Sequence, residues 1–232
     1  MSNPIVELKG VTKVYQQGKV QVHALRGVDL VVERGEFVAL WGPSGSGKST
    51  VLNLVGALDT PTSGTIALEG RDLSRMSRRA LSAMRRDRIG FVFQAYNLIP
   101  VLTAYENAES VMALQGTSAS EREQRVMTLL EEVGLKGMEH RRPYEMSGGQ
   151  QQRVAIARAI ASNPAVVLAD EPTANVDSAT SEKLLDIMAK LNEERQITFV
   201  FSTHDPRVMS YAKRLVGLVD GRVDTDEVKQ PV

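Results

Sequence analysis

The sequence predicts an α/β fold with a parallel-sheet core, a small N-terminal antiparallel sheet and a helical segment inserted into the core. Three short apolar runs predict the core: FVALW at 37–41, AVVLA at 165–169 and ITFVF at 197–201. Such unbroken runs are typical of strands buried on both faces, as in a parallel sheet covered by helices. Each run is followed by polar residues. Because ligands of these sheets bind beyond the carboxyl ends of the strands, we expect the polar ends to converge on one site.

The composition is that of a globular protein with a sizeable core. Of the 232 residues, 42% are hydrophobic and 24% are charged. Lys plus Arg and Asp plus Glu both number 28, so the basic excess typical of a dedicated nucleic-acid-binding protein is missing. The chain has no cysteine, and His23, His140 and His204 are too scattered in the sequence to suggest a zinc site. No signal peptide or membrane span is expected, so any association with a membrane would be indirect.

The N-terminal part of the chain has a different pattern from the core. The segments IVELKGVTKVY, HALRGVDLVVE and GTIALEG show alternating β-branched residues interrupted by glycines. This pattern predicts a small antiparallel sheet.

A glycine-rich loop follows the first core strand. Gly42, Gly47, Lys48 and Ser49 match the pattern GxxxxGK[ST] of a phosphate-binding loop between a strand and a helix. Glycine is costly in an ordered segment, so the glycines indicate close approach of the backbone to a ligand. Loop N–H groups would bind phosphate, Lys48 would reach the β- and γ-phosphate oxygens, and Ser49 would coordinate Mg²⁺. The alternative is a glycine-rich turn with a helix cap.

Helices are predicted between the strands. Apolar residues spaced at i, i+3, i+4 and i+7 indicate two helices with one buried face each. These sets are Val51, Leu54, Val55 and Leu58, and Leu184, Ile187, Met188 and Leu191. Residues 104–162 are predicted to be largely helical. The tail after Gly221, RVDTDEVKQPV, is expected to be loosely ordered.

Two carboxylates follow the strand at 165–169. Asp170 could hold a magnesium shell, and Glu171 could orient and polarise a water molecule for in-line attack on a γ-phosphate. The alternative is an exposed strand end with no catalytic role.

The segment MSGGQ opens the helix QQQRVAIARAI. Ser147 and Gln150 have the spacing of a capping box. Gly148 and Gly149 are poor helix formers that allow close approach of an anion, so this helix end could also bind phosphate. Propensity alone does not decide between a good helix start and a second phosphate site.

Together these motifs resemble the ATP-binding cassette family, the ATPase subunits of ABC transporters. The resemblance runs from about Ile5 to Val223, with the motifs in the family's order and spacing. It implies a P-loop NTPase fold of the ABC ATPase type, with ATP and Mg²⁺ as cofactors. It also implies a single domain over 1–232, with a nucleotide-binding core and β-subdomain at 1–94 and 163–232, and a helical subdomain at 95–162 that carries the MSGGQ signature.

The resemblance also implies roles for individual residues. Glu171 would be the general base, Lys48 and Gln94 would be further catalytic residues, and His204 would sense the γ-phosphate. Tyr15 would stack on adenine. The implied nucleotide-binding residues are Tyr15, Gly42, Pro43, Ser44, Gly45, Ser46, Gly47, Lys48, Ser49, Thr50, Ser147, Gly148, Gly149, Gln150 and Asp177. The implied magnesium ligands are Ser49, Gln94 and Asp170. An ordinary strand tyrosine and a structural histidine are the alternatives at positions 15 and 204.

In this family the signature of one subunit closes over ATP held by the phosphate-binding loop of another. The resemblance therefore implies a homodimer around two ATP molecules, with Asp177 contacting the second subunit. It further implies integral membrane permease partners, no nucleic acid, and a peripheral location on the cytoplasmic face of the inner (plasma) membrane. ATPases of DNA repair and chromosome organisation place a long coiled coil between loop and signature, but Lys48 and Ser147 are only 99 positions apart. Translation factors of this superfamily carry two cassettes, whereas this chain has one.

Two stretches, RRDRIGFVFQAYNLIPVLTAYENAE and LADEPTANVDS, resemble the branch that pairs with lipoprotein-releasing, macrolide-efflux and cell-division type permeases. The branch implies export or extraction of lipoprotein, peptide or drug-like cargo. The alternative is a transport-inactive signalling complex that activates a cell-wall hydrolase through its membrane partner. Met146 and Val176 depart from the family's usual residues but are conservative in size and polarity, so modest kinetic effects at most are expected. Trp41 is also uncommon in the family, and packing at the strand end would explain it.

The partner is expected to dock in a groove between the sheet domain and the helical subdomain. The segment AYNLIPVLTAYEN offers an apolar set, from which Leu98 and Leu102 are expected to be exposed. The full set is Tyr96, Leu98, Ile99, Leu102 and Tyr105. The arginine-rich run at 71–88 could contact anionic lipid or an acidic permease loop, or could be a solvated helix face.

Overall fold

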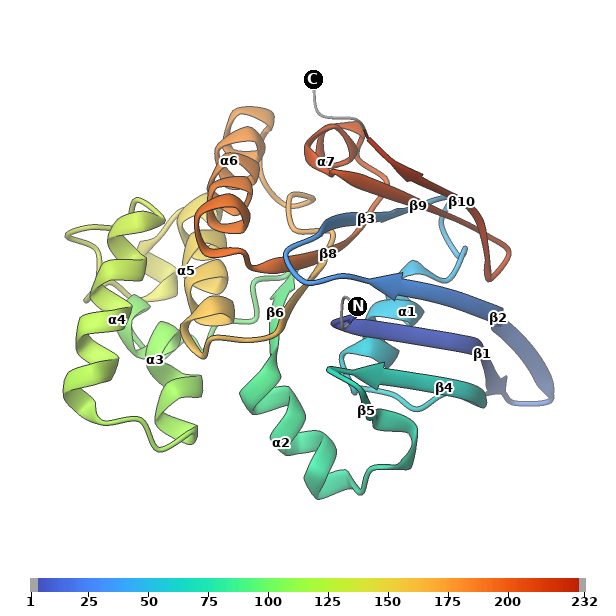
Figure 1. Cartoon of the computed structure of the whole chain (residues 1–232). Coiled ribbons are helices and arrows are strands. Elements are labelled where there is room, and N and C mark those ends of the chain that lie inside the picture. Colours follow the sequence, from blue (N-terminus) through green and yellow to red (C-terminus); the bar gives the residue numbers. More distant parts are fainter. Residues whose placement is uncertain (1–3, 230–232) are drawn as a thin grey trace.

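The computed structural model describes residues 4–229, which form two sheets and the helices around them (Figure 1). The strands are β1 (Val6–Gln17), β2 (Val20–Val32), β3 (Phe37–Trp41), β4 (Ser63–Leu68), β5 (Arg71–Asp72), β6 (Ile89–Phe93), β7 (Val166–Asp170), β8 (Thr198–Thr203), β9 (Arg214–Val219) and β10 (Arg222–Val228). The α-helices are α1 (Lys48–Val55), α2 (Arg78–Arg88), α3 (Ala104–Leu114), α4 (Ala119–Glu132), α5 (Gly148–Ala161), α6 (Ser178–Arg195) and α7 (Pro206–Tyr211). Two 3₁₀ turns lie at Leu73–Arg75 and Pro143–Glu145.

The larger sheet has the strand order β10-β9-β3-β8-β7-β6. Strands β9, β3, β8, β7 and β6 are parallel, and only β10 is antiparallel to its neighbour. The three apolar runs form β3, β7 and β8 at its centre, which confirms the predicted parallel core. Strand β6 was not predicted as a strand. Its sequence IGFVF starts at Ile89, immediately after the last residue of α2, Arg88. Neither residue at this junction is a glycine or proline that would mark a boundary.

The C-terminal tail corrects one expectation. Residues 222–228 form β10 and are not loosely ordered, whereas 230–232 lie outside the described residues. Most β10 side chains are exposed, so the strand carries almost no apolar signal. It is held by the antiparallel ladder to β9 and by a bidentate ion pair in which the Arg214 guanidinium donates to Asp226 at 2.7 Å.

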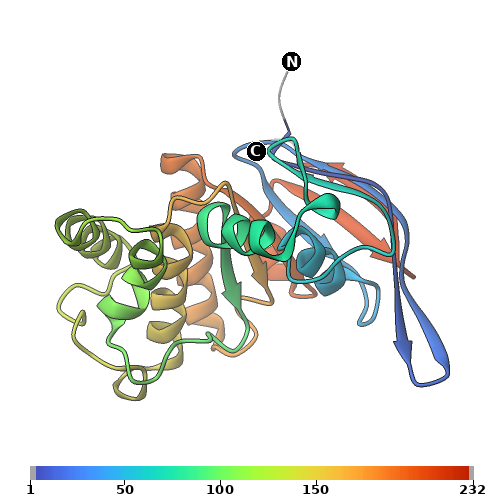
Figure 2. The same cartoon turned by 90° about the horizontal axis from the view of Figure 1, so that it is seen from below.

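The smaller sheet has the order β2-β1-β4-β5 and is antiparallel throughout, as predicted. Its longest element is the β1–β2 hairpin, whose tip extends beyond the body of the molecule in Figure 2. Gly18 occupies the turn with a φ of 62°, a conformation that glycine adopts without strain. In this hairpin Tyr15 lies opposite Val22.

Helix α1 lies between the two sheets, since it contacts β7 and β8 on one side and β2 and β4 on the other. Val51, Leu54 and Val55 are buried there, as predicted. The helix ends at Val55, so the fourth predicted member, Leu58, lies beyond it and is 49% exposed. This arrangement fixes the N-terminus of α1 at the edge where β3 ends.

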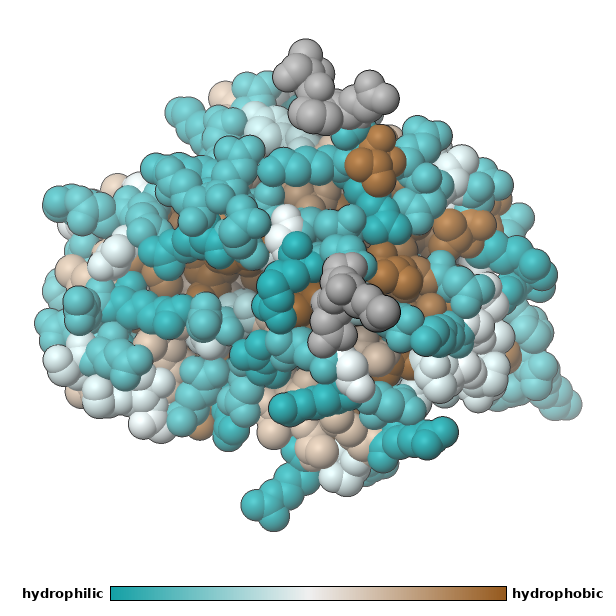
Figure 3. Space-filling view, in the orientation of Figure 1, coloured by the Kyte–Doolittle hydropathy of each residue, from teal (hydrophilic) through white to brown (hydrophobic). Residues whose placement is uncertain are grey.

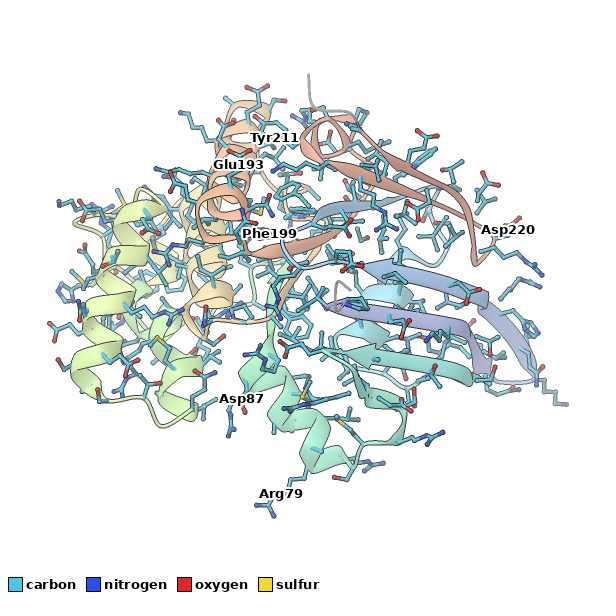
Figure 4. The ribbon with its side chains drawn as sticks, in the orientation of Figure 1. Arg79, Asp87, Glu193, Phe199, Tyr211 and Asp220 are labelled. Carbon is cyan, nitrogen blue, oxygen red and sulfur yellow. The ribbon has the colours of Figure 1, made fainter. Side chains whose placement is uncertain are left out.

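The opposite face of the larger sheet is covered by α5 and α6. Phe199 (labelled in Figure 4) packs there with Phe37 and Phe201, with ring centroids 5.4 Å and 5.7 Å apart respectively. Leu184, Met188 and Leu191 of α6 are buried, and Ile187 packs against the same cluster, so the predicted helix face is confirmed. Tyr211 of α7 donates to Asp186 of α6 at 2.7 Å, and this hydrogen bond, more than burial, raises the pKa of Tyr211 to about 12.

Helices α3, α4 and α5 gather on one side of the molecule (Figure 1), which confirms that residues 104–162 are largely helical. The segment that enters α3 is pinned by Asn107, which is fully buried. The Asn107 amide accepts from the Ile99 N–H at 2.8 Å and donates to the carbonyls of Ile99, Leu102 and Thr103. Because this one side chain bonds the Ile99 N–H and all three carbonyls, it fixes the backbone conformation of residues 99–103.

The surface in Figure 3 is mainly hydrophilic, with apolar residues in small separate areas. None of the helices formed by residues 4–229 is both long enough and apolar enough to cross a membrane. The arginine-rich run forms β5, a 3₁₀ turn and α2, and Arg79 projects away from the body (Figure 4). Arg75 of the 3₁₀ turn and Arg78 and Arg79 of α2 are exposed, which both a solvated helix face and a contact with lipid or a permease loop require.

Candidate functional site

A cavity of about 640 Å³ opens at the carboxyl ends of β3, β7 and β8. The three polar segments that follow these strands all contribute to it, so the structure brings together residues that are far apart in the sequence. Its lining residues are Val22, His23, Ala24, Ser44, Gly45, Gly47, Lys48, Ser49, Thr50, Gln94, Glu171, Ala174, Ser202 and His204. The volume is in the range typical of small-molecule sites.

The loop from Gly42 to Gly47 wraps the N-terminus of α1. Gly42 has a φ of 145°, and a Cβ at this position would collide with the carbonyl oxygen of Leu218. Gly47 has a φ of 108°, and a Cβ there would lie 2.8 Å from the Ala24 carbonyl oxygen. Gly47 is also the N-cap of α1, and it has no side chain to bond the first helical N–H groups. These N–H groups and the helix dipole form an anion-binding site.

Lys48 lies inside this loop and is only 8% exposed. Its Nζ donates to the carbonyl oxygens of Gly42 at 2.8 Å and Pro43 at 3.0 Å. An ammonium has three donors, so the loop holds the charge in place while leaving one donor for a phosphate oxygen. Beside it, the Ser49 hydroxyl donates to Oδ1 of Asp170, the last residue of β7, at 3.1 Å.

Glu171 follows Asp170 in a left-handed conformation with a φ of 47°, and its N–H donates to the Ser202 carbonyl. Its side chain is oriented by two groups from the end of β8: Nδ1 of His204 lies 2.7 Å from Oε1, and the Thr203 hydroxyl donates to Oε2 at 3.4 Å. The carboxylate favours the histidine tautomer with the proton on Nδ1. Backbone strain at this position costs on the order of 1–3 kcal/mol and is typical of functional sites.

Gln94, directly after β6, lines the cavity, and its carbonyl accepts from the Asn175 amide at 2.9 Å. The Asn175 carbonyl in turn accepts from the Tyr96 hydroxyl at 3.1 Å. Arg158 of α5 donates to the carbonyls of Tyr96 and Asn97, two residues with positive φ. The segment after β6 is therefore tied both to the loop after Glu171 and to helix α5.

Tyr15 is half-buried and is not one of the lining residues, although its cross-strand partner Val22 is. Its hydroxyl donates to Oδ2 of Asp59 at 2.9 Å. Burial, followed by the hydrogen bond and the charge of Asp59, raises the pKa of the Tyr15 phenol, so the donor stays protonated.

The signature residues do not line this cavity. Ser147 caps α5 and forms the predicted capping box with Gln150. Gly148 faces the Tyr96 hydroxyl, and Gly149 approaches the Thr180 side chain so closely that a Cβ would collide with it. Asp177 caps α6, and the hydrogen bonds from the Thr180 hydroxyl and N–H lower its pKa. The N-terminus of α5 therefore lies outside the cavity that the phosphate-binding loop lines.

The cavity fits a nucleoside triphosphate. It combines free helix N–H groups, one buried cation and an open volume, and buried Ser46 and Ser202 hydroxyls lack a protein partner among residues 4–229. No cluster of three or more acidic or histidine side chains in that range could hold a metal ion alone. A magnesium ion would therefore be held by Ser49 and Asp170 together with phosphate oxygens, which is usual for this ion.

Several residues at or near this site were not predicted. Val22, His23 and Ala24 reach the cavity from β2, and Ser202 reaches it from β8. No local pattern marks these residues, because their position depends on strand pairing. Gln152 is fully buried and joins α5 to the loop that follows β7: its amide donates to the Pro172 carbonyl at 2.6 Å. Among the departures, Met146 is buried, Val176 packs against the core, and Trp41 packs beside Gly217.

The comparisons with known proteins agree with this geometry. Residues 25–174 match the model of the ABC transporter family. The chain is 50% identical to an uncharacterized ABC transporter ATP-binding protein of Thermotoga maritima, over 95% of this chain and 94% of the relative. It is 48% identical to the lipoprotein-releasing system ATP-binding protein LolD of Anaeromyxobacter dehalogenans, over 97% and 95%. It is 45% identical to the macrolide export ATP-binding/permease protein MacB of Hyphomonas neptunium, where the match covers 97% of this chain but 35% of the relative.

The fold is shared with a solved structure, the dimeric post-hydrolysis state of the ATP-binding cassette MJ0796 bound to ADP and Pi. The TM-score is 0.89 at 44% identity, and the match covers 98% of this chain and 100% of the other. MJ0796 is from Methanocaldococcus jannaschii. The chain therefore belongs to the ABC transporter family, as an ATP-binding cassette with the ABC ATPase fold.

Proposed function

We propose that this chain is the ATP-hydrolysing subunit of an ABC transporter complex that exports or extracts lipoprotein, peptide or drug-like cargo. The observation that carries the proposal is the convergence of Lys48, Ser49, Glu171 and His204 on one cavity at the carboxyl edge of the larger sheet. Asp170 does not line the cavity itself, but it accepts a hydrogen bond from the Ser49 hydroxyl. The relatives named for lipoprotein release and macrolide export support this branch. We place the core with its β-subdomain at 1–94 and 163–232, and the helical subdomain at 95–162.

We assign each residue of the cavity a separate role in phosphoryl transfer. The uncapped N–H groups at the start of α1 and the Lys48 ammonium bind the β- and γ-phosphates, and Tyr15 stacks on adenine. Glu171 orients a water molecule for in-line attack and accepts its proton, while His204 contacts the γ-phosphate and holds the carboxylate. Ser49, Asp170 and Gln94 would hold Mg²⁺, which when bound would neutralise charge that develops on the phosphate oxygens.

Phosphate release by the purified chain tests this assignment. We expect hydrolysis to require Mg²⁺ and to stop on addition of EDTA. In the Ser49→Ala variant, the Mg²⁺ concentration for half-maximal rate should rise about tenfold or more, because a protein ligand is lost. The Ser110→Ala variant, which removes a hydroxyl bonded within α3, is the matched control. Hydrolysis that persists without Mg²⁺, or an unchanged requirement in Ser49→Ala, would contradict the proposed metal site.

The functional unit in this proposal is a homodimer that encloses two ATP molecules. The phosphate-binding loop and the signature helix end lie at different places on one chain, so the second anion site needs a nucleotide held by another subunit. Asp177, at the start of α6 beside Gly149, would contact the partner. The dimeric form of MJ0796 supports this arrangement.

The membrane partner in this proposal is an integral permease, with the chain bound peripherally to the cytoplasmic face of the inner (plasma) membrane. A groove of about 430 Å³ lies between the larger sheet and the helical region. It contains apolar groups, including Phe91 and Leu114, beside the guanidinium groups of Arg85 and Arg158. This surface suits a partner helix that has both an apolar side and a carboxylate.

Within the segment AYNLIPVLTAYEN, the prediction that Leu98 and Leu102 are exposed is wrong. Leu98 and Leu102 are half-buried, and Leu98 packs against the core, because Asn107 turns this segment inward. The large apolar side chains of this segment that face solvent are Ile99, 45% exposed, and Val101, 71% exposed. The docking test therefore belongs at these two positions.

Charged substitutions at Ile99 and Val101, which are exposed and lie outside the lining of the groove, should separate docking from hydrolysis. We expect Ile99→Asp and Val101→Asp to leave the ATPase rate of the isolated chain within about twofold, because neither residue lines the cavity, and to reduce co-purification of the permease at least tenfold. Met127→Asp, at an apolar position on α4 whose exposure of 42% is close to that of Ile99, is the control and should retain assembly. If both variants assemble and respond to permease as the wild type does, this docking surface is wrong.

A further inference from the structure

A network of three side chains lies behind the nucleotide cavity, between β1 and the segment that follows α1. Lys13 is only 9% exposed, and its Nζ donates to Oδ1 of Asp59 at 2.6 Å and to the Thr60 carbonyl at 2.8 Å. The other carboxylate oxygen of Asp59 accepts from the Tyr15 hydroxyl at 2.9 Å. The Lys13 ammonium also lies over the Tyr15 ring, 4.8 Å from its centroid.

These contacts restrict the Tyr15 ring. The hydrogen bond to Asp59 fixes the far end of the side chain, and the ammonium occupies one ring face through a cation–π contact. A planar base can then stack only on the opposite face. A ring fixed before binding loses less conformational entropy when the ligand arrives, and affinity rises accordingly.

The same network sets the position of β1 relative to the phosphate-binding loop. Asp59 follows α1, whose first turn belongs to that loop, and Lys13 and Tyr15 are on β1. Val22, opposite Tyr15, lines the cavity, and so does Thr50, whose side chain is close enough to affect the pKa of Tyr15. The ion pair therefore joins the element proposed to bind adenine to the helix that presents the phosphate site.

The charge states support these contacts. Burial alone would raise the pKa of Asp59, but hydrogen bonds from Lys13, the Thr60 N–H and Tyr15 outweigh burial and lower it. Asp59 is thus ionised at neutral pH and accepts from both partners. A hydrogen bond to a charged group contributes more than one between neutral groups.

We propose that Lys13 and Asp59 are positioning residues for the nucleotide: they hold the Tyr15 ring in the orientation that accepts adenine, at a fixed spacing from the phosphate-binding loop. The proposal rests on the proposed role of Tyr15 in adenine stacking. Neither residue contacts the reacting atoms. Their effect is on affinity for the base, not on the rate of phosphoryl transfer.

Steady-state ATPase kinetics of Tyr15→Phe, Asp59→Asn and Lys13→Met test this proposal. Tyr15→Phe keeps the ring and removes the hydroxyl, and with it the hydrogen bond to Asp59. Each variant should raise KM for ATP about three- to tenfold, which corresponds to the loss of one hydrogen bond, with kcat within twofold of the wild type. Inhibition by tripolyphosphate, which has no base, should keep its wild-type inhibition constant in all three variants.

A matched control separates positioning from general stabilisation of the smaller sheet. Glu69 accepts from both Arg34 and Arg88 and has a side-chain exposure similar to that of Asp59, 21% against 29%. Glu69→Gln should lower the melting temperature without changing KM. A rise in KM in Glu69→Gln equal to that in Asp59→Asn would overturn the proposal, as would a weakened inhibition by tripolyphosphate in the three variants.

Tyr15→Ala distinguishes failure of this proposal from failure of the stacking role. If Tyr15→Ala leaves KM for ATP unchanged, Tyr15 does not bind adenine, and both claims fall. If Tyr15→Ala raises KM while Tyr15→Phe, Asp59→Asn and Lys13→Met do not, stacking stands and the positioning role of Lys13 and Asp59 is wrong.

Discussion

The Lys48→Ala variant should lose ATP hydrolysis almost completely, with a rate at least about 10²–10³-fold below the wild type. The reason is the position of the Lys48 ammonium, which is buried within the loop, is held by the Gly42 and Pro43 carbonyls and keeps one of its three donors for a phosphate oxygen. Phosphoryl transfer depends on cations fixed where negative charge develops on the phosphate oxygens. The measurement is phosphate release with Mg²⁺ by protein freed of contaminating ATPases.

Loss of activity must be separated from loss of folding. The Lys48 side chain makes hydrogen bonds to two carbonyls, so thermal unfolding of Lys48→Ala should be compared with that of the wild type. Lys213→Ala removes another lysine, one that donates to Asn192 outside the cavity, and should hydrolyse ATP normally. A folded Lys48→Ala variant with an unchanged rate would show that the phosphate site lies elsewhere.

The Glu171→Gln variant should bind ATP, fail to hydrolyse it and accumulate as a dimer. Glutamine keeps the size of the side chain and one oxygen that can accept from His204 or Thr203, but it cannot accept a proton from water. ATP then remains between the phosphate-binding loop of one copy and the signature of the other. Gel filtration with ATP and Mg²⁺ should show a dimer for Glu171→Gln and mainly monomer without nucleotide. A monomer under both conditions would contradict the proposed dimer.

Much of the fold was predictable because its signals are local. The buried strands β3, β7 and β8 show unbroken apolar runs, and the capping box at Ser147 needs only four residues. Strand β10 was missed because an exposed edge strand needs no apolar residues and forms through pairing with β9. Leu58 was assigned to α1 by periodicity alone, yet the helix ends three residues earlier.

In the site too, residues that belong to one continuous motif were predictable, and residues brought in by tertiary packing were not. The loop Gly42–Thr50 and the pair Asp170 and Glu171 are recognisable because each is one continuous motif. The Lys13–Asp59 pair and Val22 are brought to the site by strand pairing and by the packing of α1, which a single sequence does not reveal. The exposure of Ile99 and Val101 in place of Leu98 and Leu102 likewise depends on Asn107, which turns the segment from within the core.

The central claim is that each nucleotide site is completed by two copies of the chain, and mixing two inactive variants tests it most directly. Lys48→Ala lacks the phosphate site, and Ser147→Arg blocks the signature helix end. In a mixed dimer, one composite site has both an intact loop and an intact signature. We therefore expect each variant alone to be inactive and the mixture to recover a measurable ATPase rate that increases with protein concentration. No recovery from two folded variants, or full activity of Ser147→Arg alone, would contradict the account.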